Sequence, residues 1–222
     1  NWGTTTIGQG SPVSNGKYGN VVLTAVWTPK QFTISYNLNN GAWASNYTAP
    51  TSYTYTSSAI TLPTASNVSR SGYSFAGWTE TFTIKNWYNG FINLNTGVIG
   101  PDSTYPNSIY SEAVSLKAGV KYTITGGNAN VRWRIFDFSG NYLGSLSGSS
   151  TYTATENCVA YILFYAGASS DERNCVITAS EKATTIPTQS LGNRTYVATW
   201  TANKIEVTLN VNDVNSGNGS TS

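Results

Sequence analysis

The side chains available for catalysis are limited, because the sequence contains no histidine. This absence excludes a Ser-His-Asp or Cys-His nucleophile and removes the commonest zinc ligand. The two cysteines, Cys158 and Cys175, cannot form a metal cluster alone, and no glycine-rich loop has the context that phosphate binding requires. The chemistry that remains is a pair of carboxylates of the glycosidase type.

Carboxylates are spread over residues 82–182, but their contexts favour structural roles. Asp137 precedes a turn, where an Asp side chain commonly caps the backbone. Asp171 and Glu172 are typical of a hairpin tip. The other candidates in this stretch are Asp102, Glu112, Glu156 and Glu181. We therefore expect a protein that is not an enzyme and that uses no cofactor or metal.

Exposed aromatic side chains offer a second kind of chemistry, the binding of sugar rings, which have a flat apolar face and polar edges. Trp87 and Tyr88 are adjacent in an irregular stretch after a predicted strand, where they could form a platform for a ligand. The alternative is that Trp87 fills one end of a hydrophobic core. Tyr105, Tyr110 and Tyr142 could line the rim of such a site or lie on an ordinary β surface.

Residues 131–138 alternate in a way that predicts a strand with two different faces. The apolar face, which we expect in a core, contains Val131, Trp133 and Ile135. The other face contains Arg132, Arg134 and Phe136. Two like charges at this spacing repel each other unless something negative pairs with them, either an acidic glycan or a carboxylate such as Glu112 or Glu156. The candidate ligand-binding residues are therefore Trp87, Tyr88, Arg132, Arg134 and Tyr142.

The two cysteines could form a disulfide or remain buried thiols. If the strands that contain them form a simple hairpin around residues 168–174, Cys158 lies about seven residues, or roughly 23 Å, from the residue opposite Cys175. That separation exceeds the reach of a disulfide, so the sequence leaves both states open.

Short strands must position all these residues. Apolar and polar residues alternate at 31–38, which predicts a half-buried strand. Further extended segments are expected at 51–62 and 74–79, with an irregular crossover at 63–71. Within 82–182, candidate strands separated by turn residues lie at 82–86, 108–116, 121–125, 131–138, 151–155, 159–165 and 174–178. This spacing predicts an antiparallel β-sandwich of jelly-roll type.

A repeat at a fixed offset organises the chain. Residues 19–28 (GNVVLTAVWT) return as residues 192–201 (GNRTYVATWT), an offset of 192 − 19 = 173. Trp2 and Trp27 are 25 residues apart, whereas Trp78 and Trp200 are 122 residues apart, so about 97 residues (122 − 25) are inserted in the second copy. Because Trp27, Trp78 and Trp200 define the repeat, we expect all three in a core.

The repeat predicts four parts. They are the end of a preceding repeat at 1–29, a β-grasp-like host at 30–81 plus 183–202, an inserted sandwich at 82–182, and the start of another repeat with a flexible tail at 203–222. Residues 196–200 are expected to return beside the earlier host strands and close the host fold.

Four host segments carry a family resemblance: residues 31–43 (QFTISYNLNNGAW), 60–63 (ITLP), 71–78 (SGYSFAGW) and 196–201 (YVATWT). Together they resemble the Listeria–Bacteroides repeat, also called the internalin B-repeat. The resemblance implies a small β-grasp module that occurs in arrays on secreted or wall-attached bacterial proteins. That family usually continues directly from the Gly-Trp motif to its last strand, so the insertion here suggests presentation of a second module.

The inserted part has a resemblance of its own, carried by residues 117–124 (KAGVKYTI) and 134–142 (RIFDFSGNY). These segments are similar to carbohydrate-binding-type sandwiches of phage tail and bacterial surface proteins, although Leu163 stands where many of those have an arginine. The resemblances imply an extracellular adhesin segment that binds a glycan or another host-surface ligand and contacts neighbouring repeats. The alternatives are a structural stalk or spacer, or an accessory module tethered to an enzyme elsewhere on the chain.

Composition limits the partners further. Charged residues are only 10% of the chain, the net charge is +2, and no basic stripe is present, so nucleic acid is not expected. The longest apolar run, residues 158–166, suits a buried strand rather than membrane insertion. The sequence has no methionine and begins within a repeat, so we expect a segment of a longer chain whose signal peptide or wall anchor lies outside it.

Overall fold

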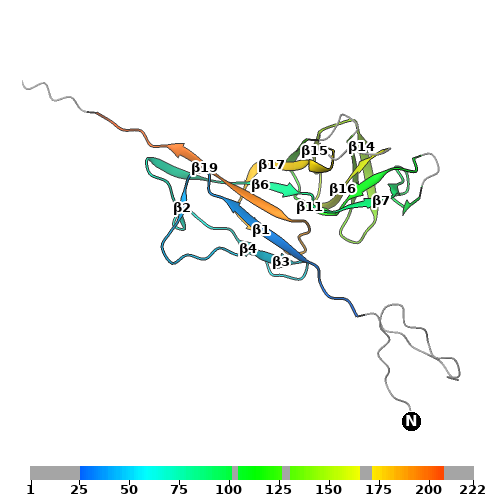
Figure 1. The fold of residues 1–222 in the computed structure, drawn as a ribbon, viewed down its shortest axis with the longest axis horizontal. Helices are drawn as coiled ribbons and strands as arrows, with labels where there is room; N and C mark the ends of the chain where they lie inside the picture. The colour runs from blue at the N-terminus through cyan, green and yellow to red at the C-terminus, as the bar shows by residue number, and fades with distance from the viewer. Residues whose placement is uncertain (1–25, 102–104, 127–130, 166–171, 208–222) are drawn as a thin grey trace, which may run out of the picture.

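The computed structural model describes residues 26–101, 105–126, 131–165 and 172–207, and within these ranges the protein is all-β (Figure 1). The one helical element among them is a short 3-10 turn, η1 (Glu172–Asn174). No helix in these ranges is long and apolar enough to cross a membrane. The all-β class predicted from the strand pattern is therefore confirmed.

The larger sheet contains seven strands. Their order is β15 (Thr151–Thr153), β12 (Lys121–Thr125), β17 (Val176–Ala183), β6 (Tyr73–Thr83), β19 (Arg194–Ala202), β1 (Gln31–Asn37) and β3 (Ser52–Thr54). Neighbouring strands are antiparallel except β1 and β19, which are parallel. The predicted return of residues 196–200 is confirmed, since β19 lies between β1 and β6.

The second sheet contains six strands. They are β14 (Tyr142–Ser147), β13 (Arg132–Phe136), β16 (Cys158–Phe164), β10 (Ile109–Ser111) and β7 (Trp87–Asn89), with β11 (Val114–Leu116) also paired to β16. Three two-stranded sheets complete the described part: β18 (Thr185–Ile186) with β4 (Ile60–Thr61), β2 (Ala42–Trp43) with β5 (Val68–Ser69), and β8 (Phe91–Ile92) with β9 (Ile99–Gly100).

Two main hydrophobic cores lie along these sheets. The smaller one collects the alternate apolar residues of the host strands, including Phe32, Ile34 and Trp78, whose indole N–H donates to the Pro63 carbonyl at 2.6 Å. The larger one lies between the two sheets and receives side chains from both, including Phe82, Tyr122, Trp133 and Ile162. The predicted apolar face of residues 131–138 is thus confirmed as core.

The two cores share strands. β6 places Trp78 in the host core and Phe82 in the core between the sheets, which is possible because residues four apart in a strand share a face. In Figure 1, β6 runs from the part that contains β1, β2 and β4 toward the part that contains β14, β16 and β7. The larger sheet therefore continues without a break from β3, β1 and β19 through β6 to β17, β12 and β15.

A buried ion pair connects the two cores. Glu80 on β6 and Arg194 on β19 are both buried, and Arg194 Nη1 donates to Glu80 Oε1. Arg194 also donates to the Tyr53 hydroxyl at 2.9 Å and to Ser115 Oγ at 2.7 Å, and Tyr196 donates to Glu80 Oε1 at 2.8 Å. Burial lowers the pKa of Arg194, but Glu80, Tyr53 and Tyr196 together raise it above its ordinary value, so the guanidinium stays charged.

Several predictions about local structure were wrong. Trp27, which was expected in a core, is 88% exposed, whereas Trp200 packs against Phe75 and donates its indole N–H to the Leu38 carbonyl. Residues 82–86 do not form a separate strand, since β6 extends through Thr83. No strand was predicted between residues 138 and 151, where β14 forms.

The two cysteine-bearing segments do not form the hairpin that was considered as one possibility. β16 belongs to the second sheet, whereas Cys175 directly precedes β17 of the larger sheet. Cys158 and Cys175 are both free, buried thiols that belong to the core between the sheets. The buried-thiol alternative is therefore the one found. Most of the predicted preceding repeat (1–25) and residues 208–222 lie outside the described part of the chain.

Candidate functional site

The outer face of the second sheet carries most of the candidate binding residues. The register pairs Arg132 with Leu163, Arg134 with Tyr161, and Tyr110 with Tyr88, and paired residues share a face. The prediction that Arg132, Arg134 and Phe136 lie on one side of their strand is consistent with this register. What the sequence did not indicate is that other residues cover much of that side.

Arg134 was predicted to meet a ligand or a carboxylate, and the structure contradicts both. The side chain is 0% exposed. Its Nε donates to the Ile92 carbonyl at 2.9 Å, Nη1 to the Trp133 carbonyl at 3.1 Å, and Nη2 to the Tyr165 hydroxyl at 3.3 Å. The physical reason is that Ile92, on β8, lies over this face and supplies a backbone acceptor. Arg134 is a structural residue.

Arg132 lies at the same edge of the sheet and is half-buried. Its guanidinium is centred 3.6 Å from the centroid of the Tyr165 ring, which is a cation–π distance. Tyr165 in turn stacks on Tyr105 at 4.2 Å, and Tyr105 stacks on Phe91 at 5.7 Å. The arginine and these rings therefore form one aromatic cluster.

Trp87 packs against the core between the two sheets, which was the alternative to a binding role. Its ring lies 5.4 Å from that of Phe164, and its indole N–H donates to the Arg173 carbonyl at 3.1 Å. Tyr142 also differs from the prediction of an open binding residue, since it packs against Phe136 and donates its hydroxyl hydrogen to the Leu94 carbonyl. Both side chains anchor structure, because each polar end has a backbone partner.

Tyr88 is the predicted binding residue that remains open, with 43% of its surface exposed. It lies 5.4 Å from Tyr110 between ring centroids, at an interplanar angle of 32°, and Tyr110 meets the edge of Tyr161 at 6.2 Å. Gly90 permits this arrangement, since its φ is +138° and a Cβ there would lie 3.3 Å from the Tyr110 ring.

These tyrosines line a hollow of about 340 Å³, which we call the tyrosine hollow. Its other lining residues are Lys30, Phe32, Ile99, Glu112, Ala113 and Leu191. The sequence gave no reason to join these positions, because they lie up to 161 residues apart (191 − 30).

A charged pair lies at one side of the tyrosine hollow. Lys30 Nζ is 3.0 Å from Glu112 Oε2, and Glu112 also accepts from the Lys85 N–H and from Asn86 Nδ2, each at 2.9 Å. Burial raises the pKa of Glu112, but the hydrogen bonds from Asn86, Lys85 and Lys30 together lower it below its ordinary value. Glu112 is therefore a carboxylate held by the fold, and Lys30 is its half-exposed partner.

Several carboxylates in the described ranges have partners within the fold. Asp137 accepts from the Ser139 and Asn141 backbone N–H groups at 2.8 Å each, the turn-capping role that its context predicts. Within the described residues, no three His, Cys, Asp or Glu side chains gather as a metal site. Asp102, Asp171 and the side chain of Glu172 lie outside the described part.

A scan against protein-family models, a search of curated proteins and a search of solved structures each gave no match. The conclusions that follow therefore depend on the fold and on the geometry of the site alone.

Proposed function

We propose that this chain is a non-catalytic, extracellular segment of a bacterial surface protein that binds a glycan in the tyrosine hollow. In this proposal a β-grasp-like host presents an inserted sandwich of jelly-roll type for adhesion. The observation that carries the proposal is Tyr88, a large aromatic ring that is 43% exposed beside Tyr110 and the Lys30–Glu112 pair.

The chemistry of the tyrosine hollow suits a sugar. A pyranose ring can lie on the Tyr88 face, where its C–H groups contact the π surface, while its hydroxyls meet polar groups at the edge. Lys30 uses one N–H on Glu112 and has three in total, so it can donate to a sugar oxygen. The hollow contains one positive and one negative side chain, which favours a neutral glycan over a highly charged one.

A glycan array probed with the whole chain tests this function. We expect binding that Tyr88→Ala weakens about tenfold, or about 1.4 kcal/mol, the scale of one aromatic contact. Tyr73→Ala is the matched control, because Tyr73 is 37% exposed but lies on β6 away from the tyrosine hollow. Equal binding by the parent chain and the Tyr88 variant would contradict the assignment of the site.

A structural spacer is the second candidate function. The continuous seven-stranded sheet favours it, because strands shared by two cores make a stiff connection. A chain that binds no glycan on the array, and that unfolds in one transition unaffected by added sugars, would support the spacer over the adhesin.

A further inference from the structure

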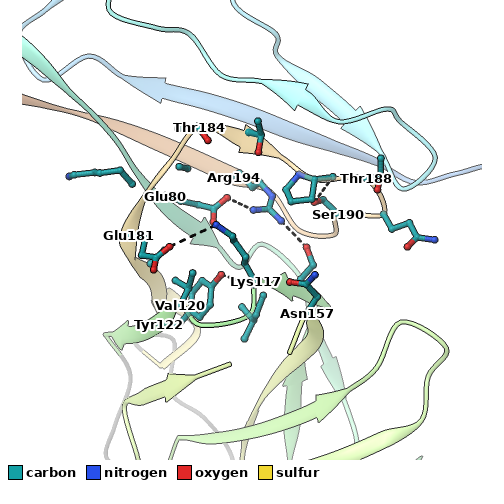
Figure 2. Close-up of a pocket in the computed structure, with 18 of the residues that line it drawn as sticks. Glu80, Lys117, Val120, Tyr122, Asn157, Glu181, Thr184, Thr188, Ser190 and Arg194 are labelled. Atoms are coloured by element: carbon teal, nitrogen blue, oxygen red, sulfur yellow. Dashed lines mark hydrogen bonds and ion pairs between the residues drawn. The ribbon is translucent and has the colours of Figure 1, made fainter. Parts of the chain in front are cut away.

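A second cavity lies where the inserted strands meet the segment that returns to the host (Figure 2). We call it the junction cleft. One side comes from residues 115–122 with Asn157, and the other from residues 179–190. It shares no lining residue with the tyrosine hollow. Its volume of about 280 Å³ is near the low end for ligand sites, which suits a ligand of about one sugar ring.

A buried carboxylate forms part of the lining. Glu80 is only 7% exposed, and its Oε1 receives hydrogen bonds from both Arg194 and Tyr196. Its other oxygen, Oε2, receives none from any residue that the structure describes, although Glu80 lines the cleft. Oε2 is not among the fully buried side-chain atoms that lack a partner in the described part of the chain, so it is open to the cleft as an acceptor that a bound molecule can use.

Donors lie near this acceptor. In Figure 2 the Lys117 side chain points into the cleft toward Glu80, and its Nζ lies 3.8 Å from Glu181, an exposed and loose pair. The Tyr122 hydroxyl accepts from the Lys117 N–H at 2.8 Å, which leaves its own hydrogen to be donated elsewhere. Burial raises the pKa of Tyr122 to about 12, so this hydroxyl is protonated at neutral pH.

The remaining lining is partly apolar and partly uncharged polar. Leu116, Val120 and Pro187 contribute carbon surface, and Thr184, Thr188 and Asn157 contribute hydroxyl and amide groups (Figure 2). Asn157 accepts from the Ala118 N–H through Oδ1 at 2.9 Å, so its amide hydrogens can be donated to another partner.

We propose that the junction cleft binds a small, neutral, polyhydroxylated molecule, such as a single sugar ring. One hydroxyl donates to Glu80 Oε2, and its neighbour accepts from Lys117. Adjacent hydroxyls satisfy both groups at once, because each hydroxyl both donates and accepts. The lining combines the carboxylates of Glu80 and Glu181 with the cations of Lys117, Lys182 and Arg194. An ion of either sign would therefore meet a like charge, so a neutral ligand is favoured. This site is separate from the glycan site proposed above.

Titration of the whole chain with sugars, followed by amide NMR, tests the cleft. The neutral probes are glucose, galactose, mannose and N-acetylglucosamine, and glucosamine and glucuronate serve as charged analogues. At about 10 mM, which is tenfold above a millimolar Kd, we expect a neutral sugar to shift amide signals of residues 115–122 and 184–190. The charged analogues should shift them less.

Two variants locate the binding. Lys117→Met should weaken it about tenfold, as expected for one charge-assisted hydrogen bond, and the exposure of Lys117 makes this change compatible with folding. Lys121→Met is the matched control, since Lys121 is an exposed lysine on β12 that does not line the cleft. Binding unaffected by Lys117→Met, or no shift with any neutral probe, overturns the proposal.

Tyr88→Ala separates the two proposals. It should leave the junction-cleft shifts unchanged even where it abolishes glycan-array binding, because Tyr88 does not line the cleft. A glycan array without signal combined with retained cleft shifts would therefore refute only the tyrosine hollow. Loss of both signals in Tyr88→Ala would show that the cleft is not an independent site.

Discussion

Replacing Arg194 with methionine is expected to remove a large part of the stability of this fold. The variant keeps the length and apolar volume of the side chain but leaves the Glu80 carboxylate buried with Tyr196 as its remaining donor. Breaking a buried pair by removing one partner costs about 3–5 kcal/mol. Because single domains are stable by only about 5–15 kcal/mol, this loss is severe but compatible with a folded variant.

Urea unfolding followed by circular dichroism measures the effect. With a slope of about 2–3 kcal/mol per M for a chain of this size, a loss of about 4 kcal/mol lowers the midpoint by about 1.3–2 M. Arg173→Met is the matched control, since Arg173 is exposed, and its midpoint should stay near that of the parent chain. In the double variant Glu80→Gln/Arg194→Met the loss should be smaller than the sum of the single losses by about 1–3 kcal/mol, because no charge is left buried.

The reasoning fails if Arg194→Met lowers the midpoint by less than about 0.5 M, or about 1 kcal/mol. Such a result would mean that Glu80 is hydrated or protonated at little cost, and that the buried pair does not tie the two cores together. Additive losses in the double variant would contradict the coupling between the two side chains in the same way.

Three further outcomes are expected from the structure. The folded pKa of Glu112 is lowered from its ordinary value of 4.5, so the stability that Glu112 contributes is present above pH 4.5 and is lost as the pH falls through the folded pKa. Acid unfolding of Glu112→Gln should lack this loss. An acid profile identical to that of the parent chain would contradict the pKa shift. Burial raises the pKa of both Cys158 and Cys175 to about 11, so a thiol reagent at pH 8 should label neither until the chain is unfolded by urea, and rapid native labelling would refute their burial. Gly41→Ala should cost about 1–3 kcal/mol in urea unfolding, because a Cβ there would lie 2.4 Å from the Trp200 ring. Gly72→Ala is the comparison, because a Cβ there would meet no atom within 4 Å, so its cost comes from the backbone φ of +76° and not from a clash.

Alternation along the sequence predicted which face of a strand is apolar. Phe32 and Ile34 in β1, and Trp133 and Ile135 in β13, follow a period of two and are buried as expected. The same alternation places two charged residues on buried faces. Glu80 has the phase of Trp78 and Phe82, and Arg194 has the phase of Tyr196, so each charge stands on a buried face of its strand. Two such charges in a chain with few charged residues predict a buried pair.

The sequence by itself therefore determined the all-β class, the position of most strands and the apolar side of each, because these depend on neighbours along the chain. Only the tertiary structure decided what lies over each face. It placed Ile92 over Arg134, put Cys158 in the second sheet and Cys175 just before a strand of the larger one, and assembled the tyrosine hollow from residues as far apart as Lys30 and Leu191. The physical reason is that strand pairing and sheet packing join segments distant in sequence, and local periodicity carries no information about which segments meet.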